Sequence, residues 1–232
     1  MSDAVTPDEL SAAIAAHAEW LASEGDAGTR LEMPGANLEY AMLFEADLRG
    51  ADLSGARLYN ANLRECVLAG AELRDTNFEG ASLVNVVFTE AQMAGAKFDK
   101  AVAPGGLFHG ADLTAASFRE ANLLSAELHE AELVNADFYD ANLAGALAVK
   151  ANCRGADFTN AKLMMVDMTD ASLAEASFNQ TVVFGATMNG CDVTGTDFSQ
   201  VNGLTEDQLA QVCGSAATQL PPDLAGVSLK GR

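Results

Sequence analysis

The sequence predicts an all-β solenoid of about eight coils, and two regular spacings support that prediction. From Ala36 to Gln200 the chain reads as 33 consecutive five-residue units without an insertion. Each unit has a compact residue two positions before its central residue, which is usually large and apolar. Phenylalanine also recurs at the centre every 20 residues, at Phe78, Phe98, Phe118, Phe138, Phe158, Phe178 and Phe198. We interpret the shorter spacing as one side of a coil and the longer one as a whole turn.

The five-residue period fits neither an α-helix nor a flat strand. In an α-helix five residues rotate by about 500°, so successive centres would spiral around the helix and form no apolar stripe. In a strand the side chains alternate, so an odd period would place successive centres on opposite faces. All centres can reach one core only if the backbone turns a corner in every unit.

The residue types within a unit predict where each position lies. The small position is Ala in 25 of the 33 units, and the centre is Leu in 16 and Phe in nine. Asn or Asp precedes the centre in 14 units, and Gly is frequent at the last place. Both types tolerate the backbone angles of tight corners. We therefore expect Ala inside the corners, and Phe rings stacked along the axis at about the 4.8 Å strand spacing.

The segments that flank the repeat predict two helices. Thr6-Pro7-Asp8-Glu9 is a capping box with Pro at the first helical position, which predicts a helix over 7–23. Thr205-Glu206-Asp207-Gln208 is a second capping box and predicts a short helix that stops at Gly214. Helices are expected at both ends because a solenoid exposes unpaired edges there. The predicted organisation is a helical cap and connector over 1–35, the repeat over 36–203, and a cap helix with an extended tail after Pro221-Pro222 over 204–232.

The motif Ala-(Asp/Asn)-Leu-x-x, in phase over 165 of the 232 residues, resembles that of the pentapeptide-repeat proteins. This resemblance implies a right-handed quadrilateral β-helix. Most members of the family have no known activity. The best-understood members bind DNA gyrase or topoisomerase IV as mimics of duplex DNA and protect against quinolones or related inhibitors. Those members commonly carry loops that project from the coils, whereas this repeat has no insertion.

Composition limits the classes of partner and compartment. The chain has 33 acidic and 13 basic residues, a net charge of −20, which argues against direct binding to nucleic acid. It has no apolar run of the ~18 residues that a membrane helix needs, and its first residues lack the basic flank of a secretory signal. We expect a cytoplasmic protein. The cysteines are widely spaced and are expected to be small buried hydrophobes: Cys66, Cys153, Cys191 and Cys213.

The sequence predicts no enzyme, no cofactor and no metal. It contains no hydrolase elbow, Walker loop, dinucleotide fingerprint or zinc-protease motif. His109 and His129 lie 20 residues apart, hence on one outward column, with Glu127 and Glu130 nearby. Two imidazoles and a carboxylate could hold a metal ion, but a flat exposed pair is more often ordinary surface, and we favour that interpretation.

Two outward surfaces are candidates for binding. The first is an acidic face, predicted at Asp52, Glu72, Glu90, Asp112, Glu130, Glu132, Asp170 and Asp192. The second is an apolar strip along one corner, predicted at Phe44, Val84, Leu107, Leu124, Leu147, Met164, Met165 and Phe184. Each surface also has an explanation that involves no binding: the acids keep the rod soluble, and some apolar side chains fold back over the corners.

The sequence therefore predicts a non-enzymatic scaffold for protein interactions, built on a rigid acidic rod. The alternative is a DNA mimic that binds a type II topoisomerase and protects it from quinolone-type inhibitors. In either case the expected partner is a protein, with neither nucleic acid nor membrane bound directly, and self-association into a homodimer is a further possibility.

Overall fold

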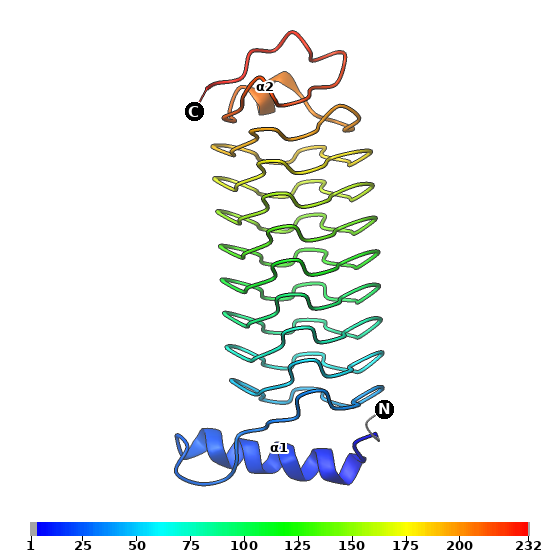
Figure 1. The fold of residues 1–232 in the computed structure, drawn as a ribbon, viewed down its shortest axis with the longest axis vertical. Helices are drawn as coiled ribbons and strands as arrows, with labels where there is room; N and C mark the ends of the chain where they lie inside the picture. The colour runs from blue at the N-terminus through cyan, green and yellow to red at the C-terminus, as the bar shows by residue number, and fades with distance from the viewer. Residues whose placement is uncertain (1–3, 232) are drawn as a thin grey trace.

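The structure, a computed structural model, describes residues 4–231 as a rod of stacked coils with a helix across its N-terminal end (Figure 1). The C-terminal segment loops over the opposite end of the stack. The prediction about the chain start rests largely on residues 1–3, which lie outside the described residues. No helix within 4–231 has both the length and the hydropathy required to cross a bilayer.

Parallel bridges divide the outside of the rod into four faces. Between Glu32 and Asn202 each bridging residue is the one before a centre, and its partner lies 20 positions away, as Glu72 does from Asp52. We number the faces by their bridging columns: face 1 from Glu32 to Asp192, face 2 from Asn37 to Asp197, face 3 from Met42 to Asn202, and face 4 from Asp47 to Thr187. The two residues after each centre form the corner that leads to the next face, and we assign them to the face that they follow.

The β-structure takes the form of isolated bridges, and no longer strand occurs within 4–231. On face 1 the N–H of Glu72 donates to the Ala51 carbonyl, and the N–H of Leu53 donates to the Glu72 carbonyl, both at 2.9 Å. A corner every five residues leaves a single residue per side in this pairing. The predicted all-β class is thus realised with the shortest possible strands.

The corners explain the polar residues of the repeat. The last residue of most units has a left-handed φ, such as 66° at Gly55 and 53° at Asn60. All 14 Asn or Asp side chains before a centre accept a hydrogen bond from the backbone N–H two residues later, as Asp112 does from Thr114 at 3.1 Å. These bonds satisfy a corner N–H that has no ladder partner.

The core follows the predicted pattern of small and central residues. Phe98 and Phe118 are fully buried and stack at 4.7 Å between ring centroids, with 5° between their planes. A second column, Phe88 and Phe108, meets the first edge-on, which the sequence analysis did not foresee. A threonine at a small position keeps its buried hydroxyl hydrogen-bonded: the Thr76 hydroxyl donates to the Leu53 carbonyl at 2.9 Å.

Two helices begin at the predicted capping boxes. Helix α1, Pro7–Ala22, matches the expected 7–23. Helix α2, Glu206–Leu209, stops well before the expected Gly214, because the chain there returns to bridging and Cys213 pairs with Asp192. The tail is also not simply extended. It turns back so that Lys230 bridges Cys213, and the Gly214 N–H donates to the Lys230 carbonyl at 2.8 Å.

Candidate interaction surfaces

The predicted acidic residues gather on face 1 and the corner before it. Five are bridging residues of one column: Asp52, Glu72, Asp112, Glu132 and Asp192. The other three, Glu90, Glu130 and Asp170, occupy left-handed corner positions between face 4 and face 1 and are exposed. The structure therefore brings all eight onto one side of the rod.

Part of this acidity serves the fold. Asp52 accepts a hydrogen bond from the Ser54 N–H at 3.0 Å, and this backbone bond lowers the pKa of its carboxyl. Glu72 pairs with Arg74 at 2.6 Å, and Glu132 accepts from the Asn152 amide at 2.7 Å. The carboxylates before a centre are thus partly committed to turns, whereas those at the corners project into solvent.

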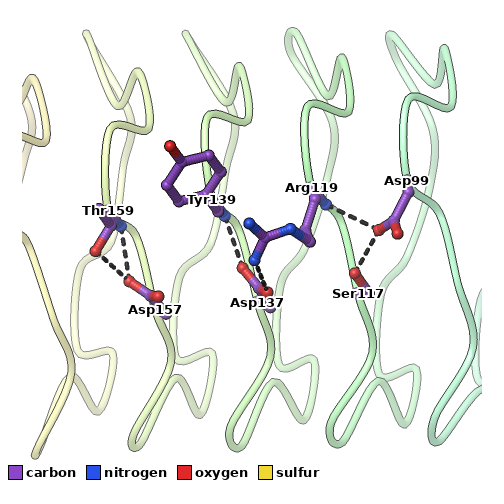
Figure 2. Close-up of polar contacts among 7 residues, drawn as sticks. All are labelled: Asp99, Ser117, Arg119, Asp137, Tyr139, Asp157 and Thr159. Atoms are coloured by element: carbon purple, nitrogen blue, oxygen red, sulfur yellow. Dashed lines mark hydrogen bonds and ion pairs between the residues drawn. The ribbon is translucent and has the colours of Figure 1, made fainter.

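On face 2, carboxylates pair with side chains of neighbouring coils, as Figure 2 shows. The Arg119 guanidinium donates to Asp137 at 2.6 Å and lies 4.4 Å from the centroid of the Tyr139 ring. The Arg119 backbone N–H and the Ser117 hydroxyl both donate to Asp99. This ladder links successive coils at the surface and pairs the carboxylates of Asp99 and Asp137.

Face 3 differs because it is almost uncharged. Its eight units between residues 41 and 185 contain two acids and two bases, which sum to zero: Glu45, Arg64, Glu65 and Lys162. The eight units of face 1 between residues 51 and 195 contain seven acids and two bases. Beyond Glu65, Lys162 is the only charged residue of face 3 through residue 185.

Exposed large hydrophobic side chains concentrate on the same face. Seven of the nine in the described chain belong to units of face 3: Met42, Phe44, Val102, Leu124, Met164, Met165 and Phe184. The remaining two border it, Tyr40 just before face 3 and Leu147 on face 4. Met42, a bridging residue, and Met165, a corner residue, are each 71% exposed.

Six residues of the predicted apolar strip lie on face 3 and its corner with face 4, whereas Leu107 and Leu147 belong to the bridging column of face 4. Phe44, Leu124, Leu147, Met164, Met165 and Phe184 are exposed, whereas Val84 and Leu107 are half-buried. Some folding back does occur: the Phe184 ring lies against Gly203, where an added Cβ would sit 2.5 Å from it. The sequence analysis missed Tyr40, Met42 and Val102. Taking every twentieth residue from Met42 as well as from Phe44 would have found the latter two.

The histidine pair has the predicted stacking but lacks a ligand set. His109 and His129 meet edge-on with 6.5 Å between ring centroids. Among residues 4–231 no group of three His, Cys, Asp or Glu side chains is placed to hold a metal ion. Cys66, Cys153 and Cys191 are buried as predicted, and burial raises the pKa of each to about 12, whereas Cys213 is only half-buried. The three buried thiols are therefore protonated and sealed in the core.

Comparison with known proteins identifies the repeat. The model of the pentapeptide-repeat family matches in eight copies, over residues 33–70, 66–102, 107–145, 136–173 and 163–200. A search of curated proteins gives no match. The solved structure of HetL, a pentapeptide-repeat protein involved in heterocyst differentiation regulation in the cyanobacterium Nostoc sp. strain PCC 7120, is similar. Its identity is 25% and its TM-score 0.50, over 88% of this chain and 89% of HetL.

Two further solved structures are more distant. QnrB1, a plasmid-mediated fluoroquinolone resistance protein, has 16% identity and a TM-score of 0.48, over 84% of this chain and 92% of its own. A pentapeptide-repeat protein from the Arabidopsis thaliana thylakoid lumen has 29% identity and a TM-score of 0.28, over 60% and 72%. The repeat and the HetL likeness identify the fold as a right-handed β-helix solenoid.

Proposed function

The chain belongs to the pentapeptide-repeat family, and we propose that it is a non-enzymatic scaffold whose outward faces bind protein partners. One observation carries the proposal: a uniform backbone presents an uneven surface, with exposed apolar side chains gathered on face 3 and acids on the other faces. Apolar surface left in water over many coils is typical of an interface.

The interior supports a structural role. The core positions are filled by Ala, Leu and Phe side chains, and the hollow of about 210 Å³ beside α1 is lined mainly by apolar residues such as Leu10, Ile14 and Met42. An enzyme needs convergent polar groups in a cleft. The three sealed thiols also fit a reducing compartment, and we place the protein in the cytoplasm.

The scaffold proposal is tested by disrupting the strip and measuring what the rod captures. Leu124→Glu with Met164→Glu adds two carboxylates to face 3, so proteins retained by the wild-type rod from the source lysate should be lost. Val134→Glu with Val149→Glu, which places the same charges at other corners, is the matched control and should retain them. Unchanged capture by the face 3 variant would contradict the use of this strip.

Mimicry of duplex DNA is the second candidate, favoured by the distribution of acids along the rod. Between Lys162 and Lys230 the chain has no basic residue and eight acids: Asp167, Asp170, Glu175, Asp192, Asp197, Glu206, Asp207 and Asp223. A rod of eight coils at about 4.8 Å is about 40 Å long, a length over which duplex DNA carries about 23 phosphates. The 23 acids within 36–200 match that number, although ten bases offset them.

A gyrase supercoiling assay, with and without a quinolone, separates the two candidates. A mimic should inhibit the enzyme or protect it, and Glu90→Gln with Glu130→Gln and Asp170→Asn should weaken that effect because these exposed carboxylates project from corners into solvent. Neutralising Asp99 and Asp137 on face 2, which are paired with Ser117 and Arg119, is the comparison. If the wild-type rod has no effect on the enzyme, the mimic proposal is wrong and only the scaffold proposal remains.

A further inference from the structure

We propose that face 3 is a self-association interface, at which two copies of this chain pack side by side with their rods antiparallel. The inference rests on the proposed scaffold function and names one partner for it, a second copy. It concerns the eight units of face 3 between residues 41 and 185 and the corner that follows each of them.

Charge selects face 3 as the place where two copies can meet. The whole chain carries −20, so two rods repel one another at most approaches. The face 3 units sum to zero, whereas those of faces 1, 2 and 4 are acidic. Contact through face 3 also directs face 1 of both copies away from the interface. A strongly basic partner would gain little here, because there is no net charge to attract it.

The size of the face is sufficient for a dimer of moderate stability. Eight coils at about 4.8 Å, with five residues per side at about 3.3 Å each, give on the order of 600 Å² per copy. Two such surfaces reach about 1,200 Å², the lower end of stable protein interfaces. The exposed side chains that would be covered are large, and they include Met42, Phe44, Leu124, Met165 and Phe184.

The apolar corner that follows face 3 favours the antiparallel arrangement, although the same symmetry also brings the charged corner that precedes face 3 opposite itself. If the two-fold axis runs across the face, the apolar corner of one copy meets the same corner of the other, and Phe44 and Leu124 find apolar neighbours. If the axis runs along the rod, this corner meets the one that precedes face 3. That opposite corner is charged, with Glu39, Glu79, Asp99, Lys100, Arg119, Glu120 and Asp140. Burying Leu124 against those charges would cost desolvation energy.

The few charges on face 3 define the register. If the coil of Phe44 lies opposite the coil of Phe184, then the coil of Arg64 and Glu65 lies opposite that of Lys162. Each Lys162 then lies opposite the coil that carries Glu65, and with Arg64 this pair of coils sums to +1. The same register sets the corner of Met164 and Met165 opposite that of Arg64 and Glu65. A parallel dimer in register would instead place Lys162 against Lys162. In the antiparallel register the two-fold axis passes between the coils of Val102 and Leu124.

The first experiment is sedimentation of the full chain at increasing concentration. We expect a reversible dimer that tightens several-fold as salt rises from about 50 to 500 mM, because screening removes the repulsion between the acidic faces. Val102→Glu with Leu124→Glu places four carboxylates beside the two-fold axis and should weaken the dimer by about a hundredfold or more. Val134→Glu with Val149→Glu adds the same charge elsewhere and should still dimerise.

The second experiment tests orientation by disulfide cross-linking in a Cys213→Ser background, since the other three native cysteines are buried. Met42→Cys and Val182→Cys are prepared as separate proteins. The antiparallel register predicts cross-linked dimers chiefly in the mixture of the two, whereas a parallel dimer in register would cross-link each protein with itself.

A wild-type rod that stays monomeric at about 100 µM in physiological salt overturns the inference, and so does a dimer unaffected by the face 3 carboxylates. Neither result decides the scaffold proposal, because that proposal is tested by the capture of other proteins from the lysate. If Leu124→Glu with Met164→Glu abolishes capture from lysate while the wild-type rod is monomeric, the scaffold stands and only the identity of this partner is wrong.

Discussion

The two ends of the rod meet the same structural requirement in different ways. At the N-terminal end the 16-residue helix α1 lies across the stack (Figure 1). It packs through side chains, with Leu10 and His17 buried. At the C-terminal end α2 has only four residues, and the chain continues to pair with the last coils through Cys213 and Gln219. The N-terminal end therefore combines a packed helix with the bridge from Ala4 to Asn37, whereas the C-terminal end depends largely on backbone pairing.

The largest expected difference between the ends comes from removing a buried leucine at each. Leu209 is fully buried and Leu10 is 7% exposed. Truncation of a buried leucine to Ala costs about 2–5 kcal/mol, with the cost highest where the cavity cannot collapse. We expect Leu209→Ala to destabilise its end more than Leu10→Ala, because Leu209 is fully buried whereas Leu10 keeps some exposure to solvent.

Hydrogen exchange measures each end separately. Leu209→Ala should accelerate exchange at the Cys213 amide, which donates to the Cys191 carbonyl, and leave the Leu31 amide protected. Leu10→Ala should do the reverse. Equal acceleration at both amides in either variant would mean that the rod unfolds as one unit. The two ends would then not differ in stability.

The next difference is a pH dependence confined to the N-terminal end. His17 accepts a hydrogen bond from the Leu31 N–H through Nδ1 at 3.0 Å, and its Nε2 is buried without a partner within the described chain. Burial lowers the pKa of His17. The Arg49 backbone and the Asp47 carboxylate oppose that shift, and the Arg30 and Arg49 side chains add to it. Protonation at Nδ1 would remove the bond to Leu31.

The direction of the pH effect follows from this lowered pKa. The unfolded or detached histidine takes up a proton near its ordinary pKa of about 6.5, before the packed one does. The contribution of His17 to stability is therefore present above about pH 6.5 and is lost as the pH falls below it. The C-terminal end has no corresponding buried histidine in the part of the chain that the structure describes.

Trp20 reports this transition because it is the only tryptophan and stacks on His17 at 5.4 Å. Its fluorescence and the exchange rate at Leu31 should change together between pH 7 and 5 in the wild-type protein. His17→Gln, which retains an acceptor but does not titrate, should remove that pH dependence. A titration that persists in His17→Gln would assign it to another group.

The sequence could predict the coils because every unit repeats the same requirements. Ala and Leu or Phe at fixed places specify the core, and the 14 Asn and Asp residues specify corner bonds that the structure contains. The start of each helix was also predictable, since a capping box is a local pattern. After Asn202 the bridging interval changes from 20 residues to 21, 22 and then 17, so no periodic signal remained to reveal the returning tail.

The outward surfaces were only partly predictable. Spacing placed the acids on one side, but it did not distinguish Asp112, which bonds the Thr114 N–H, from the exposed Glu130. The apolar strip was found from a single column, at Phe44 and its equivalents. The neutrality of face 3 becomes clear only when bridging and corner residues are assigned to the same side, which the pairing in the structure provides.

The smallest expected difference concerns the two capping boxes. Both have a Thr side chain that accepts from the N–H three residues later, but the third residues differ. Glu9 bonds Thr6, whereas Gln208 bonds Thr205 and also donates to the Ala186 carbonyl at 2.8 Å, which connects α2 to the preceding coil.

Gln208→Ala should therefore cost about 0.5–1.5 kcal/mol per bond lost and loosen the contact with that coil. Glu9→Ala should only fray the first turn of α1. Denaturant melts of the two variants, with exchange at the Leu10 and Leu209 amides, make the comparison. A Glu9→Ala protein that is destabilised more than Gln208→Ala would show that the N-terminal helix, rather than the C-terminal turns, depends on its capping box.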